Sequence, residues 1–286
     1  MTITFIPTCY CIGGIRIRLY VHAIIFLSLL SGFNSCETWK IDPVVEKWPM
    51  TTGSEWHYQQ THYLFKFASD SSDVITDSDT IQNLYKLWVL KDTVLNDTLA
   101  LTVFELAEED SLTWMWRQYY LLDEEGLKLY AYLPNPGPLS FRKSKAVFNN
   151  HFPLLTEQGP ETKLLYPGDK LIYLDPPRLS IQLPLKEDSY WTCQEKAPYQ
   201  FRIDKKVTGT DLIQAGGNEY ACFRVDWVYF DYIVDTDILV TEWIAEEGLI
   251  KRVVKIPRTD ITDINGEDIY SGQFAEVLQL VDVNIK

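Results

Sequence analysis

The stretch Thr241-Glu242-Trp243-Ile244-Ala245-Glu246-Glu247-Gly248-Leu249 decides how this chain folds. The run from Thr241 to Ala245 holds Thr, Trp and Ile, which favour β-strands, together with the charged Glu242, as expected of a strand with one face in a core. Glu246-Glu247-Gly248 then interrupts the run, and its glycine supplies the positive φ that a tight hairpin turn requires. The stretch therefore predicts two antiparallel strands joined by a tight turn.

Runs of the same kind follow one another along most of the chain. They are rich in Tyr, Trp, Val, Ile and Thr and are separated by Gly, Asp, Asn and Pro, as expected of strands connected by hairpins. The expected strands are 56–67, 80–90, 99–106, 113–122, 127–133, 189–196, 199–207, 219–229, 239–245, 249–256 and 274–283. We therefore predict a mainly β fold with little helix, in a single domain from 48 to 286.

Two pairs of similar segments suggest that this domain consists of two related halves. Gly53-Ser54-Glu55-Trp56 is matched by Asp188-Ser189-Tyr190-Trp191, and the segment 122–127 is matched by 244–249 with the same Glu-Glu-Gly turn. The halves would be 48–133 and 183–286, joined by a proline-rich connection, 134–182, with at most one strand near 164–174. The alternative is that common hairpin chemistry produced both similarities independently.

The N-terminal segment 1–35 has the pattern of a secretory signal peptide. Its charged residues are Arg16 and Arg18, and the apolar run that follows, 19–30, is shorter than the roughly 20 residues that a membrane-spanning helix needs. Ser35 before Cys36 is similar to the end of a bacterial lipobox, so we expect Cys36 to be lipidated and 36–47 to form a tether. Cleavage by an ordinary signal peptidase and an uncleaved anchor are the alternatives.

The acidic balance of the chain limits its partners. The formal net charge is −14, and removal of 1–35, which carries two arginines and no acidic residue, leaves the remainder more acidic still. Such a surface argues against nucleic acid and against an anionic membrane surface as electrostatic partners. The expected contact with a membrane is therefore the lipid on Cys36.

Only two cysteines, Cys193 and Cys222, remain after Cys36. Both lie on expected strands, and an oxidising compartment would allow a disulfide between them. Two reduced cysteines buried in the core are the alternative.

The motifs also resemble those of a loosely defined group of Bacteroidota-type envelope lipoproteins without an agreed activity. The resemblance rests on Leu183-Pro184-Leu185 leading to Trp191, and on the hairpin from Trp243 to Lys251. It implies a large curved antiparallel sheet similar to an incomplete β-barrel, of the kind found in lipoprotein carriers. It also implies a location in the cell envelope.

A search for catalytic and metal-binding patterns assigns no catalytic residue, no metal site and no cofactor. There is no Gly-x-Ser-x-Gly, no His-Glu-x-x-His and no phosphate-binding glycine loop. His57 and His62 are separated by an odd number of residues, so a strand directs them to opposite faces. The acidic segments 70–79 and 260–268 are interpreted as solvated turns, with calcium binding as the alternative.

Aromatic residues give the one positive indication of binding. Trp114, Trp116 and Tyr120 are spaced so that they share one face of a strand, where they would either fill the core or form a ligand surface. We expect a non-catalytic binding or assembly lipoprotein of the outer membrane, on its periplasmic face, which holds an apolar ligand or a segment of a partner protein on a concave sheet face. A carbohydrate-binding lipoprotein is the alternative, and a hydrolase of unknown type is the third interpretation.

Overall fold

The structure is a computed structural model that describes residues 43–68, 73–95, 99–109, 114–134, 171–196, 202–230, 238–262 and 269–286. All of these residues belong to one compact unit, 41–286. The expected signal segment 1–35 and Cys36 lie outside the described residues. Within the described part of the chain, no helix is long and apolar enough to cross a membrane.

The described residues form twelve β-strands, which confirms the mainly β prediction. Each of the eleven expected strands corresponds to one of them, and β6 corresponds to the strand that was allowed near 164–174 in the proline-rich connection, displaced toward its C-terminal end. The strands are β1 (Glu55–Phe67), β2 (Ile75–Leu95), β3 (Leu99–Glu108), β4 (Trp114–Leu122), β5 (Gly126–Pro134), β6 (Ile172–Gln182), β7 (Tyr190–Gln194), β8 (Arg202–Ala215), β9 (Asn218–Phe230), β10 (Leu239–Ala245), β11 (Gly248–Thr262) and β12 (Ile269–Asn284).

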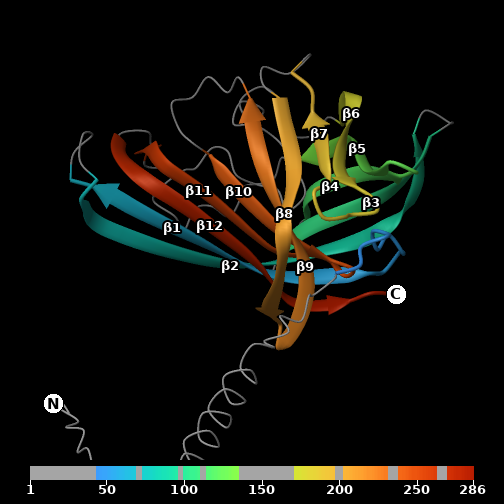
Figure 1. Ribbon diagram of the computed structural model, residues 1–286, viewed down its shortest axis with the longest axis horizontal. Helices are drawn as coiled ribbons and strands as arrows, with labels where there is room; N and C mark the ends of the chain where they lie inside the picture. Colours follow the sequence, from blue (N-terminus) through green and yellow to red (C-terminus); the bar gives the residue numbers. More distant parts are fainter. Residues whose placement is uncertain are drawn as a thin grey trace, which may run out of the picture. The chain divides into compact units, whose positions relative to one another are not determined.

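The strands form one antiparallel sheet in the order β6-β5-β4-β3-β2-β1-β12-β11-β10-β9-β8-β7. Neighbours in the sheet are therefore neighbours in sequence, except that β1 pairs with β12. The sheet curves so strongly that its two end strands, β6 and β7, lie beside each other (Figure 1). The fold is a nearly closed antiparallel barrel, as the resemblance to envelope lipoproteins implied.

The shortest connections lie at one end of this sheet. At this end, which we call the turn end, are the links β4–β5, β6–β7, β8–β9 and β10–β11, and the last two consist only of Gly216-Gly217 and Glu246-Glu247. At the opposite end, the loop end, are the links β1–β2, β5–β6, β7–β8, β9–β10 and β11–β12. The β8–β9 hairpin extends beyond its neighbours and contacts β12, where the side-chain amide of Gln279 donates to the carbonyl of Gln214 at 2.9 Å.

Both Glu-Glu-Gly turns are hairpin turns with positive φ at the glycine, as predicted. Gly126 joins β4 and β5 with φ 138°, and Gly248 joins β10 and β11 with φ 112°. The two hairpins are six strands apart in a sheet of twelve. Origin of the fold from two related halves stays a prediction.

The core fills the inside of the curved sheet near the turn end. Trp56 and Tyr58 of β1 are among its largest buried side chains. Their polar atoms bond to the β10–β11 hairpin, because Trp56 Nε1 donates to the carbonyl of Glu247 at 2.6 Å and the Tyr58 hydroxyl donates to the carbonyl of Leu249 at 2.8 Å. Val45, within the expected tether, is also a buried core residue. The packed chain therefore begins before Trp48.

Candidate binding site at the seam between β6 and β7

Two sheet edges face each other without pairing. Strands β6 and β7 are the two ends of the sheet order, and the segment 183–189 connects them. Side chains bridge them in place of a backbone ladder. Trp191 Nε1 on β7 donates to the carbonyl of Leu179 on β6 at 3.1 Å, and Lys205 Nζ on β8 donates to the carbonyl of Ser180 at 3.0 Å. We call this junction the seam.

Irregular backbone on the β6 side explains why the seam does not pair. Leu129 of β5 is opposite Arg178, but Ala131 is opposite Tyr173, so 174–177 bulges out opposite a single residue, Tyr130. Pro176 and Pro177 lie in this bulge and have no N–H to donate to a ladder. The edge of β6 therefore cannot form a regular ladder at this point.

The β7 side is irregular too, and the strand is only five residues long. Thr192 is opposite Asp204 and Gln194 is opposite Ile203, so Cys193 is an extra residue in β7. Bulges of this kind bend a strand and increase its twist. Two irregular edges consequently diverge from each other.

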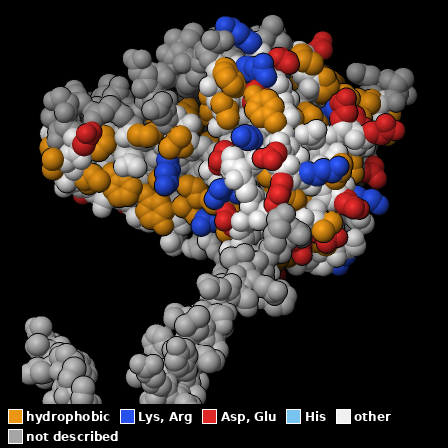
Figure 2. All heavy atoms as spheres, in the orientation of Figure 1, with side chains coloured by type: hydrophobic (Ala, Val, Ile, Leu, Met, Phe, Trp, Pro, Cys, Tyr) orange, Lys and Arg blue, Asp and Glu red, His pale blue; other side chains and the backbone are white. Residues whose placement is uncertain are grey.

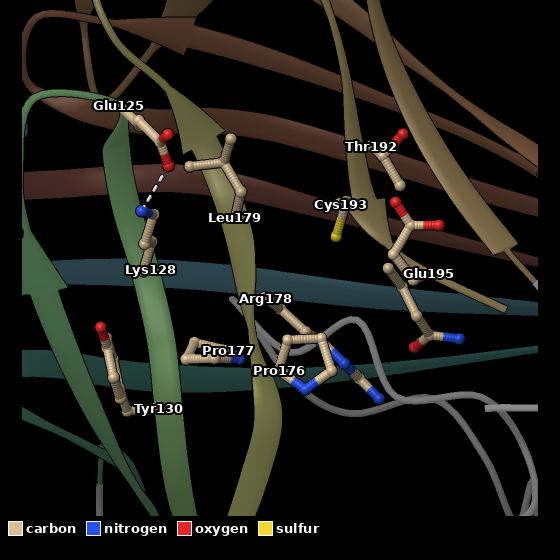
Figure 3. Close-up of a pocket in the computed structure, with 11 residues that line it drawn as sticks. Glu125, Lys128, Tyr130, Pro176, Pro177, Arg178, Leu179, Thr192, Cys193 and Glu195 are labelled. Atoms are coloured by element: carbon tan, nitrogen blue, oxygen red, sulfur yellow. Dashed lines mark ion pairs between the residues drawn. The ribbon is translucent and has the colours of Figure 1, made fainter. Parts of the chain in front are cut away.

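A cavity of about 360 Å³ occupies the seam where the edges diverge. Strands β5 and β6 supply one wall and β7 supplies the other (Figure 3). The volume lies within the range of pockets that hold small ligands. The lining residues are Glu125, Lys128, Tyr130, Pro176, Pro177, Arg178, Leu179, Thr192, Cys193, Gln194 and Glu195.

The cavity wall combines charged, polar and apolar groups. Arg178 and Gln194 are almost completely buried, whereas Glu195 is exposed at the rim. Lys128 forms ion pairs with Asp123, at 2.8 Å, and with Glu125 (Figure 3). These hydrogen bonds raise the pKa of Lys128 above its ordinary value. The wall thus offers fixed polar groups beside the rings of Tyr130 and the two prolines.

A network outside the sheet holds the short strand β7 against β8. Arg202 donates from Nε to Asp204 Oδ1 at 2.7 Å and from Nη2 to Thr192 Oγ1 at 3.0 Å, and the Tyr190 hydroxyl donates to Asp204. Burial raises the pKa of Asp204, but hydrogen bonds from Arg202, Tyr190 and Thr192 outweigh it and lower the pKa below its ordinary value. Asp204 therefore remains a carboxylate that fixes one wall of the seam.

A second network lies inside the sheet behind the seam. Glu242 of β10 accepts from Arg252 Nη2 at 2.6 Å, from Trp227 Nε1 at 2.9 Å and from Lys205 Nζ at 3.2 Å, and all except Trp227 are buried. Burial raises the pKa of Glu242, but the two cations and the hydrogen bonds outweigh it and lower the pKa to about 2. The charged Glu242 positions Lys205, whose Nζ reaches across to Ser180 on β6.

The disulfide expected between Cys193 and Cys222 is absent, because both residues are buried thiols. The register explains the error. Cys193 lies beside Thr192, which is opposite Asp204, and Asp204 is opposite Val228 of β9. Cys222 is six residues from Val228 along β9, or about 20 Å at ~3.3 Å per residue, and a disulfide needs α-carbons within about 7 Å. The thiol of Cys222 donates to the carbonyl of Tyr220 instead.

The expected aromatic surface on β4 is not formed by Tyr120. This side chain is completely buried, and its ring meets that of Phe104 edge to face at 5.4 Å between centroids. Tyr120 belongs to the core, which was the alternative interpretation of the aromatic residues on this strand. The side chains of Trp114 and Trp116 lie outside the described residues.

The histidines and acidic segments have local roles where the structure describes them. His57 lies 3.1 Å from Glu109 and His62 lies 3.2 Å from Glu276. Asp77 and Asp79 accept the backbone N–H of the following residue. Among the described residues, no group of three or more potential metal ligands comes together.

Sequence reasoning missed the seam residues, above all Arg178 and Gln194. The proline-rich character of 134–182 was the available signal, since Pro176 and Pro177 mark the bulge in β6. No pattern in the sequence indicated that the sheet would close around this bulge.

No family model matches the chain, and no curated protein matches it. Among solved structures, the chain is similar to a candidate lipoprotein from Parabacteroides distasonis, with 12% identity and a TM-score of 0.30 over 85% of this chain and 100% of that one. It is also similar to a candidate exported protein with a YmcC-like fold from Bacteroides fragilis, with 8% identity and a TM-score of 0.28 over 84% of this chain and 99% of that one.

Proposed function

We propose that this protein is a lipid-anchored, non-catalytic binding component of the bacterial cell envelope, and that the seam is its binding site. One observation carries the proposal. Eleven junctions between neighbouring strands are paired, including the closure of β1 on β12, whereas β6 and β7 leave a cavity between them. The chain keeps open one junction of an otherwise closed barrel, although pairing there would complete the sheet.

The chemistry of the seam favours a compact group as the occupant. An added β-strand needs regular donors and acceptors on the edge that it joins, and Pro176 and Pro177 remove two donors from β6. A ring or a branched polar side chain can instead lie on Tyr130 and the prolines and hydrogen-bond with Arg178, Gln194 or Glu195. A small polar ligand, or one side chain of a partner protein, fits this description.

A binding role is favoured over catalysis by the described lining residues. Cys193 supplies the thiol among them, and no histidine lines the cavity to activate it. Burial also keeps this thiol away from solvent. The proposed location is the outer membrane on its periplasmic face, with the lipid on Cys36.

In vivo photo-cross-linking tests the seam. A photoreactive amino acid at Glu195, on the cavity rim, should give a specific adduct, whereas the same amino acid at Leu212, which is exposed on β8 outside the cavity, should not. Leu179→Trp, which fills the cavity, should remove the adduct without loss of folded protein. An adduct that survives Leu179→Trp, or equal adducts at both positions, would contradict the proposal.

The lipid anchor is tested separately by Cys36→Ala. The variant should leave the membrane fraction and lose its acyl label. Retention in the membrane with an unchanged acyl label would refute the anchor and leave the cross-linking result intact.

Carbohydrate binding is the second candidate function, and one observation favours it on β1 and β2, away from the seam. On β1, Tyr63 and Phe65 have rings that are parallel within 6°, with centroids 6.5 Å apart, and the exposed Ser78 and Thr80 lie opposite them on β2. Parallel rings beside hydroxyl groups are suited to stacking on sugars. Tyr63→Ala should then weaken retention on an immobilised polysaccharide, whereas Leu212→Ala should not; equal retention would remove this candidate.

A further inference from the structure

We propose that the turn end of the sheet faces the membrane that carries the lipid, and that the loop end and the bulge at 174–177 in the seam face the aqueous compartment. This inference rests on the lipid anchor of the proposed function. The orientation also specifies the side from which a partner reaches the seam. It is supported by where the N-terminal segment is fixed and by how much chain precedes that segment, and the charge of the turns limits how closely this end approaches an anionic bilayer.

The segment that leads from the anchor is fixed to the turn end. Val45 is buried, and its carbonyl accepts the backbone N–H of Leu185 in the β6–β7 link at 3.0 Å. Trp48 packs over Gly248 in the β10–β11 turn. The hydroxyl of Ser54 accepts the backbone N–H of Lys286 at 3.1 Å, so the C-terminus lies at the same end.

The chain before this segment is short. Pro43, the first described residue, comes seven positions after Cys36, and this length of chain spans at most about 25 Å when fully extended. The lipid therefore cannot lie farther than this from the point where the chain meets the turn end. An arrangement with the loop end against the bilayer would require this link to run along the length of the strands.

The turn end is also strongly acidic. Its described links contain Asp123, Glu124, Glu125, Glu187, Asp188, Glu246 and Glu247, and one lysine, Lys186. In the visible face, acidic and basic side chains are interspersed at the centre and right, and hydrophobic side chains are more frequent at the left (Figure 2). Anionic headgroups repel such an end, and salt screens the repulsion. The lipid and the short link would therefore hold the turn end near the bilayer, and the charge of the turns adds no adhesion.

The bulge at 174–177, where the edges of the seam diverge, lies farther from the turn end than the bridging bonds to Leu179 and Ser180. The cavity lining extends from this bulge to Glu125 in the β4–β5 link. With the turn end at the bilayer, a partner would reach the bulge from the aqueous compartment.

Energy transfer to a labelled bilayer tests the orientation. Ile285 at the turn end and Leu239 at the loop end are exposed apolar residues suited to matched cysteine substitutions. Leu239 pairs with Lys255 of β11, which in turn pairs with Ala275 of β12, so Leu239 and Ala275 have the same position along the strands. The ten residues from Ala275 to Ile285 span up to about 33 Å at ~3.3 Å per residue. Lipidated full-length Ile285→Cys and Leu239→Cys, each with a donor dye, would be placed on phosphatidylcholine vesicles with an acceptor-labelled headgroup. The unsubstituted protein, whose Cys193 and Cys222 are buried, controls for labelling.

Transfer from position 285 should be at least roughly threefold that from position 239, because the difference in height is tens of Å. Equal or reversed transfer would overturn the orientation while leaving the anchor and the seam untouched. Failure to float with the vesicles would remove the anchor itself, and the orientation with it. On vesicles with phosphatidylglycerol, transfer from position 285 should fall and then recover in about 1 M salt, where the Debye length is about 3 Å; transfer that does not depend on salt would overturn the charge argument.

Discussion

Replacement of Glu242 by Gln should destabilise this protein more than almost any other single change of an acidic residue. The carboxylate is buried, and it accepts from Arg252, Trp227 and Lys205. A neutral amide at this position would leave two buried cations without their counter-charge. Removal of one partner from a buried ion pair typically costs about 3 to 5 kcal/mol. We expect a loss of this size in the free energy of unfolding at pH 7.

The pH dependence tests the cause of that loss. The pKa of Glu242 falls from an ordinary value of 4.5 in the unfolded chain to about 2 in the folded protein. A depressed folded pKa means that the stabilisation is fully present above pH 4.5 and is lost as the pH falls toward 2. At about 1.4 kcal/mol per pH unit, the charge of Glu242 contributes about 3 kcal/mol at pH 7 and about 2 kcal/mol less at pH 3.

Urea unfolding of the wild type and Glu242→Gln at pH 7 and pH 3 gives the required comparison. The difference between the two proteins should narrow by about 2 kcal/mol at the lower pH. Glu246→Gln is the matched control, because Glu246 is exposed in the next turn and its change should cost less than about 0.5 kcal/mol. A difference that is the same at both pH values would show that the charge of Glu242 is not what stabilises the fold. A loss below about 1 kcal/mol at pH 7 would refute the reasoning altogether.

The hairpins, the seam and the thiols lead to three further predictions. Gly126→Ala should destabilise the protein more than Gly248→Ala in urea unfolding, because a Cβ at 126 would lie 2.0 Å from a backbone oxygen, whereas the nearest atom to a Cβ at 248 is 3.3 Å away; the reverse order would contradict the geometry. Trp191→Phe removes one bond across the seam, so it should cost about 1 kcal/mol and speed amide exchange in β6 more than in β1; unchanged exchange in β6 would count against the seam. Cys193 and Cys222 should each react with a thiol reagent after denaturation, but not in the folded protein, where both are buried and burial raises the pKa of Cys222 to about 12. A missing thiol after denaturation would show that the two cysteines are bonded after all.

The strands and hairpins could be predicted because their signals are local. The strand from Thr241 to Ala245 and the Glu-Glu-Gly turns at Gly126 and Gly248 depend on neighbouring residues alone, and the structure confirms each. Antiparallel meanders place such neighbours side by side, so local signals describe most of the sheet. The strand boundaries were less accurate, because β8 ends at Ala215 and β11 at Thr262, eight and six residues beyond the expected ends at 207 and 256.

The candidate site could not be predicted because it depends on register and closure. The cysteines were expected to meet because one strand separates them in sequence, but the pairing of β8 with β9 sets them far apart along the strands. A charged residue is expected on the solvent face of a strand, but Glu242 points to the core face with Ile244. Its charge is compatible with burial only because Lys205 and Arg252 lie beside it. Those partners come from other strands, and no spacing in the sequence identifies them.

The pairing of β1 with β12 has a consequence for how this chain folds. One edge of β1 stays unpaired until the sixteen residues of β12, the last strand in the chain, pair with it. Contacts between such distant parts of a chain form slowly, because a large loop must close before they stabilise anything. Until then β1 exposes an unpaired edge of thirteen residues, a template for association with other chains. Truncation or slow delivery of β12 should therefore favour aggregation, even though every other strand pair is already present.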